Sequence, residues 1–197
     1  MIESYLAVPP LLGIFGLLVA FGIYIVVNRF SEGEASVKKI GDQIHLGAMV
    51  FMKREYTYLS GFAAVVIILV ALSPLGQKTA LAILAGALSS AIAGWLGMYS
   101  ATKANVRTAT AAAESGAAEA LTVAFYGGSI MGLCVASLGL IGLGSLYYIL
   151  SGDAHSIEGF GMGASIVALF SRVGGGIFTK SADVGADLVG KIEAGIP

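Results

Sequence analysis

The chain has 197 residues, of which 57% are hydrophobic and 12% charged, with a mean hydropathy of +0.88 and a net charge of −1. Ordinary soluble domains carry about 25% charged residues, so this composition argues against a soluble globular domain. The single cysteine, Cys134, offers no disulfide or metal framework, and we expect it to be a small core residue.

Long stretches without Asp, Glu, Lys or Arg follow one another along the chain. A helix of roughly 20 apolar residues crosses a bilayer core about 30 Å thick. Four uncharged stretches, of 25, 22, 24 and 33 residues, meet that length, and a fifth is interrupted by Arg172. The sequence therefore predicts an all-α, polytopic helical membrane protein, with residues 1–197 forming a single membrane domain. The predicted spans are residues 5–28, 56–77, 79–102, 120–150 and 158–179.

The positions of Lys and Arg predict how the chain is oriented in the membrane. If the N-terminus lies outside, the two inner loops hold seven Lys and Arg residues, and the outer segments hold only Lys78. Cytoplasmic loops carry an excess of these residues, so we expect the N-terminus outside. Five spans then place residues 180–193 in the cytoplasm, as a helical extension of the last span.

The two inner loops also carry helical signals. Apolar residues recur every three or four positions between Val37 and Phe51, which predicts either a helix on the membrane surface or an extension of the second span. His45 lies in this stretch, and we expect it to be a polar surface residue. The Ala-rich second loop is expected to be two helix ends that meet at Ser115-Gly116.

Small residues recur at four-residue spacing within three of the predicted spans. Such faces let helix backbones approach closely, because lipid supplies no hydrophobic drive for helix association. We expect tight helix packing, with more neighbouring helices than this chain supplies. The faces are Gly86, Ser90 and Gly94, then Gly128, Gly132 and Ala136, then Gly159 and Gly163.

Charged residues return in the last segment, and helical geometry places them along one stripe. On a helix, Asp183 and Asp187 occupy successive turns, and two such carboxylates can share a hard cation such as Mg²⁺. Lysines beside them suit phosphate oxygens. The alternative is a solvated face, in which Asp187 and Lys191 form a surface pair worth a few tenths of a kcal/mol. The stripe comprises Arg172, Lys180, Asp183, Asp187 and Lys191.

Arg172 is unusual because it interrupts an apolar span. An arginine at the bilayer centre costs about 2.5–3.5 kcal/mol on insertion scales. Arg172 either reaches the interface with its long side chain or faces a protein interior, where it needs an acidic partner. The other four spans contain no carboxylate, so that partner would come from residues beyond 197 or from another chain.

Three stretches resemble one family. FSRVGGGIFTKSADVGADLVGKIEAGIP is similar to the signature of the membrane-integral, ion-pumping pyrophosphatases, and GAMVFMKREYTYL and the segment from GMYSATKANVRTA to FYGGSIMGL agree with it. By analogy, the resemblance implies a homodimer with about sixteen membrane helices per subunit. It also implies hydrolysis of Mg-pyrophosphate on the cytoplasmic side, coupled to outward pumping of H⁺ or Na⁺.

The resemblance implies roles for individual residues. Asp183 and Asp187 match ligands of the magnesium ions, with K⁺ or Na⁺ as a further cation, and Lys180 and Lys191 match lysines that contact pyrophosphate. Arg172 matches an arginine of the ion gate. The role of Glu193 stays open. Ser181 stands where the family usually has alanine.

The family motif continues past Pro197 into further Asp-rich segments, which supply the remaining metal ligands and position the attacking water. We therefore expect this chain to be the amino-terminal third of such an enzyme, incomplete at its C-terminus and inactive alone, with no catalytic residue of its own. Its expected partners are pyrophosphate, the lipid bilayer and the remainder of the enzyme, without nucleic acid. The alternatives are a non-enzymatic membrane subunit and a small anion transporter that uses Arg172.

Overall fold

The computed structural model describes residues 7–150 and 153–195, and all regular structure in these residues is helical. Five helices are long and apolar enough to cross a membrane, which confirms the predicted all-α, five-span class. The start of the first predicted span at residue 5 and the end of the chain at Pro197 lie outside the described residues. The helices are α2 (Val8–Val27), α3 (Ala35–Leu72), α4 (Gly76–Glu114), α5 (Ala117–Ile149) and α6 (Ala154–Leu188), with a short π-helical segment, η1 (Val189–Glu193).

Local sequence explains where the helices begin and end. Pro9 and Pro10 occupy the first turn of α2, where a missing N–H costs nothing. Helix α3 ends before Pro74, because the residue preceding a proline disfavours helical geometry. Gly116 links α4 to α5 with a φ of +91°, a conformation open to glycine. The predicted meeting of two helix ends at Ser115-Gly116 is thus confirmed.

Helix α3 decides between the two interpretations of the first loop. It runs unbroken for 38 residues from Ala35 to Leu72, so the amphipathic stripe between Val37 and Phe51 belongs to an extension of the second span. At 1.5 Å per residue the helix is about 57 Å long, nearly twice the thickness of a bilayer core. The connection from α2 shrinks to a short loop, residues 28–34.

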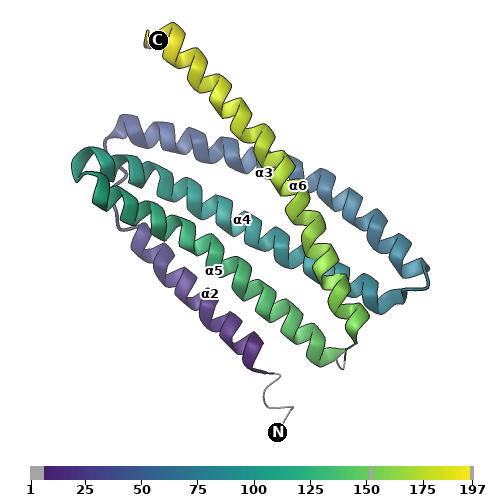
Figure 1. Cartoon of the computed structure of the whole chain (residues 1–197). Coiled ribbons are helices and arrows are strands. Elements are labelled where there is room, and N and C mark those ends of the chain that lie inside the picture. Colours follow the sequence, from purple (N-terminus) through teal and green to yellow (C-terminus); the bar gives the residue numbers. More distant parts are fainter. Residues whose placement is uncertain (1–6, 151–152, 196–197) are drawn as a thin grey trace.

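The helices lie around α4. Helix α4 packs against α3, α5 and α6, and α2 packs mainly against α5 and also touches α4. Figure 1 shows α3, α4, α5 and α2 side by side, with α6 crossing over them at an angle. The C-terminal end of α6 projects away from the other helices (Figure 1).

Two of the predicted small-residue faces meet each other. A Cβ atom added to Gly86 of α4 would collide with the Phe160 carbonyl of α6, and one added to Gly163 would collide with the Ile83 carbonyl of α4. The close approach of α4 and α6 therefore depends on glycine, as predicted.

The third predicted face is not covered within the described chain. Gly128 and Gly132 of α5 have no neighbouring atom within 4 Å of an added Cβ, and Ala136 is exposed. Helix α5 packs against α2 elsewhere, where Gly13 and Gly16 leave room for Ser137. The stripe from Gly128 to Ala136 therefore has no partner helix within the described chain, and tight packing along it stays a prediction for helices outside this chain.

Cys134 occupies the position predicted for it. Its thiol is buried in a cluster with Ala20, Val27 and Ile130, where α2, α4 and α5 meet. Burial among small apolar side chains confirms that the lone cysteine is a core residue.

Candidate functional site on the last helix

The predicted site residues lie on one continuous helix. Arg172, Lys180, Asp183 and Asp187 all belong to α6, which is unbroken to Leu188. At 1.5 Å per residue, Asp183 lies about 16 Å along the helix axis from Arg172. The helix assumed from the sequence is therefore present over this segment, and it places the arginine and the carboxylates at different heights.

The acidic and basic side chains of this segment are open to binding. Lys180, Asp183, Asp187 and Lys191 are exposed, and no ion pair joins them in the described part of the chain. Within residues 7–150 and 153–195, no three His, Cys, Asp or Glu side chains gather into a metal-binding group. The carboxylates suit Mg²⁺, which prefers oxygen ligands, but this segment supplies only part of a coordination shell.

The helical register changes just before Lys191. Val189–Glu193 form a π-helical turn, closed by a hydrogen bond of 3.0 Å from the Ala194 N–H to the Val189 carbonyl. A π turn holds more residues than an α turn, so Lys191 is rotated from the position that an ideal α-helix gives it. The predicted i, i+4, i+8 alignment holds for Asp183 and Asp187 and is altered at Lys191.

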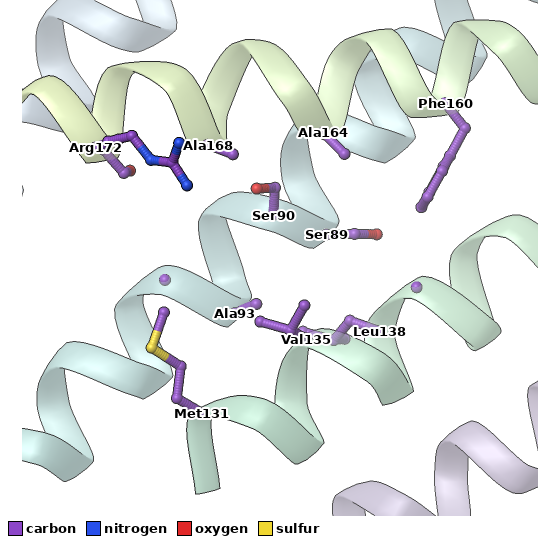
Figure 2. A pocket seen from close by; sticks show the side chains of 13 residues that line it. Ser89, Ser90, Ala93, Met131, Val135, Leu138, Phe160, Ala164, Ala168 and Arg172 are labelled. Atoms are coloured by element: carbon purple, nitrogen blue, oxygen red, sulfur yellow. The ribbon is translucent and has the colours of Figure 1, made fainter. Parts of the chain in front are cut away.

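Arg172 borders a cavity of about 500 Å³ between α4, α5 and α6. The side chains of Arg172 and Ser90 lie on facing helices at one end of this cavity, and Met131, Val135 and Phe160 give it an apolar lining (Figure 2). No acidic side chain of the described residues lies within ion-pair distance of Arg172. This part of the chain thus presents a guanidinium group beside an apolar cavity without a counter-ion.

Comparison with known proteins places the chain in a family. A family model described as inorganic H⁺ pyrophosphatase matches residues 14–197. The chain belongs to this family. It is 49% identical over 99% of its length to a putative K⁺-stimulated pyrophosphate-energized sodium pump from Clostridium tetani. It is 47% identical, again over 99% of its length, to a K⁺-insensitive pyrophosphate-energized proton pump from Methanosarcina mazei.

A third pyrophosphatase relative, a K⁺-insensitive pyrophosphate-energized proton pump from Moorella thermoacetica, is 46% identical over 95% of this chain. The chain spans 29% of the length of the first two of these relatives and 28% of the third. A family member of their length would hold several more helices than the five described here, so the five helices are part of a larger bundle.

Sequence reasoning missed an ion-pair cluster in this chain. Glu32, in the loop between α2 and α3, accepts from Arg107 of α4 at 2.9 Å and from Lys38 of α3 at 2.8 Å. Arg107 is buried, and its Nη1 also donates to the Lys103 carbonyl at 2.6 Å. The sequence analysis counted Arg107 only among the basic residues of the second inner loop. In the structure Arg107 is the buried member of an ion-pair cluster with Glu32 and Lys38, which we call the latch.

Electrostatics favour the ionised form of Glu32. The hydrogen bond from Lys38 lowers the pKa of Glu32 below its ordinary value; partial burial opposes this shift, and the positive charge of Arg107 adds to it. A lowered pKa means that the ionised form of Glu32 is more stable in the folded protein than in the unfolded chain. The latch therefore holds the α2–α3 loop against α4 at neutral pH.

His45 is half-buried and makes contacts that the sequence did not predict. Its Nδ1 lies 2.7 Å from the Thr102 hydroxyl oxygen, and its ring meets the edge of Tyr99 at 5.0 Å between centroids. The Thr102 hydroxyl is also 3.0 Å from the carbonyls of Met98 and Tyr99, so its one hydrogen points to the main chain. The Nδ1–H of His45 is then the donor to Thr102, and the ring joins α3 to α4 as a packed residue.

Proposed function

We propose that the chain is the amino-terminal part of a membrane pump that hydrolyses Mg-pyrophosphate on the cytoplasmic side and couples hydrolysis to outward transport of H⁺ or Na⁺. The observation that carries this proposal is helix α6. One unbroken helix bears Arg172 beside the bundle and Asp183 and Asp187 on its projecting end. A displacement of such a helix would link events at the two levels directly.

Each charged residue of the stripe has a role in this proposal. Asp183 and Asp187 hold Mg²⁺ through their carboxylate oxygens, and Lys180 and Lys191 bind the phosphate oxygens of pyrophosphate. The bound metal supplies electrophilic stabilisation of charge on the transferring phosphoryl group. The lysines add fixed positive charge where that negative charge develops. Arg172 acts in the ion gate, and Glu193 stands beside the stripe without an assigned role.

The names of the relatives support a monovalent cation in addition to Mg²⁺. One relative is described as a K⁺-stimulated sodium pump and two as K⁺-insensitive proton pumps. The chain is about equally similar to both kinds, so we leave both H⁺ and Na⁺ as cargo in the proposal. We infer that the residues that select the ion, and those that respond to K⁺, lie on helices that complete the pump.

Two surfaces of the described chain support the proposal that further helices complete the bundle. The open stripe from Gly128 to Ala136 on α5 and the unpaired Arg172 on α6 are surfaces that a larger bundle would cover. We propose that these surfaces meet the remainder of the same enzyme, that the complete protein is a homodimer, and that residues 1–197 alone hydrolyse no pyrophosphate.

Inverted membrane vesicles test the proposal. Vesicles that contain the complete protein should release phosphate from Mg-pyrophosphate added outside and should take up either H⁺, followed with a pH-sensitive dye, or radioactive Na⁺. Vesicles that contain residues 1–197 alone should match vesicles without the protein. Hydrolysis without uptake of either ion, or hydrolysis by residues 1–197 alone, would contradict the proposal.

A further inference from the structure

Helices α3 and α6 contact each other along three layers of side chains, which we call the α3–α6 seam. Phe51 packs on Phe178 and Phe62 on Phe170, each with ring centroids 5.1 Å apart. Between these aromatic layers, Glu55 of α3 lies against Gly174 of α6. Phe170, Gly174 and Phe178 are four residues apart and share one side of α6.

The seam lies on the back of the site helix. At 100° per residue, Arg172 is about 160° around α6 from Gly174, and Asp183 is about 180° from it. The face that carries the gate arginine and the metal-binding carboxylates therefore points away from α3. Helix α3 holds α6 from behind and leaves its functional face open.

Glu55 is an unexpected residue at the centre of such a seam. Its Oε1 is buried and has no hydrogen-bond partner among the described residues. A buried polar atom without a partner costs free energy that an apolar side chain in the same place would not. Stability alone therefore does not account for a carboxyl group here, and such groups in native structures call for a functional explanation.

The carboxyl group occupies the space that Gly174 leaves. A Cβ atom built on Gly174 would lie 3.0 Å from Cδ of Glu55 and 3.1 Å from Cζ of Phe51, and it would collide with Oε1 of Glu55. One turn away in either direction, the same side of α6 presents Phe170 or Phe178. A slide of α6 by one turn would bring a phenyl ring onto the carboxyl group, so the seam accepts Glu55 at one axial position.

We propose that Glu55 is a positioning residue for the pump: its carboxyl group, seated at Gly174, fixes the axial position of α6 and hence of Arg172 and the metal-phosphate face. This inference rests on the proposed function for its effect on transport, and on the seam alone for its effect on the position of α6. Glu55 contacts neither the substrate nor the transported ion. It acts through α6.

The activity test uses the complete protein in sealed inverted vesicles and measures ions taken up per pyrophosphate hydrolysed. Gly174→Ala pushes the carboxyl group out of its seat and should lower that ratio about fivefold, the size of a modest coupling between sites. Glu55→Ala should lower it similarly. The double variant Gly174→Ala/Glu55→Ala should recover most of the ratio, because the added methyl group fills the space that the carboxyl group vacates.

Two controls separate positioning from loss of fold. Gly161→Ala adds the same methyl group to α6 at a site with no atom within 4 Å, and it should leave the ratio unchanged. Glu55→Gln keeps the shape of the side chain and should behave like the original protein. A merely structural role would lower hydrolysis and transport together in each seam variant, without recovery in the double variant, and that pattern would overturn the proposal.

A distance measurement tests the same idea without activity. Spin labels are placed on the exposed positions Lys53 of α3 and Ile192 of η1, in a variant of the complete protein in which Cys134 and any other native cysteine are replaced. Gly174→Ala should shift the distance distribution measured by pulsed electron resonance, and the added Glu55→Ala change should reverse the shift. Unchanged distances in Gly174→Ala would refute the positioning role. Absence of ion uptake by the unaltered protein would instead refute the proposed function, and the distances would still decide the role of Glu55.

Discussion

At the residue scale, Asp183 and Asp187 carry the metal-binding part of the proposed function. They are exposed and form no ion pair in the described chain, so their carboxylates do not serve the stability of this bundle. In the complete protein, Asp183→Ala or Asp187→Ala should reduce Mg-dependent pyrophosphate hydrolysis about a hundredfold or more, measured as phosphate release. Glu114→Ala, which removes an exposed acid from the end of α4, is the control. Near-normal turnover in either aspartate variant would remove these residues from the site.

The ion pair between Glu32 and Arg107 makes a prediction about pH. The pKa of Glu32 is lowered in the folded protein, so the carboxylate stabilises the fold above its unfolded pKa of about 4.3, and this contribution is lost as pH falls through the lower folded value. Glu32→Gln should therefore lower the free energy of unfolding at pH 7 by roughly 1–3 kcal/mol, because the buried Arg107 loses its counter-ion. The thermal midpoint should fall accordingly. The difference between the variant and the original protein should shrink as pH falls below the unfolded pKa and disappear below the lowered folded pKa of Glu32.

Tryptophan fluorescence from Trp95 reports this unfolding in detergent, and Glu34→Gln serves as the matched control. Glu34 lies in the same loop, is exposed and forms no ion pair among the described residues. Its substitution removes the same charge without breaking the latch. Equal midpoints for Glu32→Gln and the original protein at pH 7 would show that the latch contributes nothing to stability.

At the scale of elements, the contact between α4 and α6 depends on backbone proximity. Gly163 faces the Ile83 carbonyl, so Gly163→Val should force the two helices apart and cost about 1–3 kcal/mol or more. Gly161→Val changes the intrinsic helix preference of the same helix equally but meets no atom within 4 Å. Thermal unfolding should show a markedly lower midpoint for the first variant. Similar midpoints for the two would mean that the close approach at Gly163 is unimportant.

Element boundaries show what a single sequence can and cannot decide. The amphipathic stripe before Phe51 has the same periodicity in a surface helix and in an extended span, so the pattern left both open. The structure resolves the choice through the short loop at residues 28–34, held by Glu32 on Arg107. That ion pair joins residues far apart in sequence, so no local sequence pattern predicts it.

At the scale of the whole molecule, the proposed topology puts the loop at Lys78 outside the cell and the exposed end of α6 in the cytoplasm. We predict that a cysteine at Lys78 is labelled by an impermeant maleimide in intact cells, and that one at Ile192 is labelled only in inverted vesicles. Both substitutions belong in a variant in which Cys134 and any other native cysteine are replaced, although the buried Cys134 should react slowly by itself. The reverse pattern of labelling would place the metal-phosphate face outside and contradict the proposed topology.

Much of the architecture follows from the spacing of charges. Uncharged gaps mark four of the five helices, an apolar stretch interrupted by Arg172 marks the fifth, and Ser115-Gly116 marks the turn between α4 and α5. The sequence could not place His45 on Thr102, because that contact joins α3 to α4. Nor could it show that no described residue covers Gly128 and Gly132, because four-residue spacing indicates a packing face but not which helix packs on it. The charged stripe was visible for the opposite reason: its spacing is local to one helix.

The link between α4 and α5 has a practical consequence. Helix α4 contains 39 residues and is therefore about 58 Å long, while the bilayer core takes about 30 Å of that length. Residues 112–119 around the Gly116 turn are exposed and make no part of the buried core. Residues 112–119 are therefore a suitable site for inserting an affinity tag or an antibody-fragment epitope, away from both the lipid and the packed helices described here.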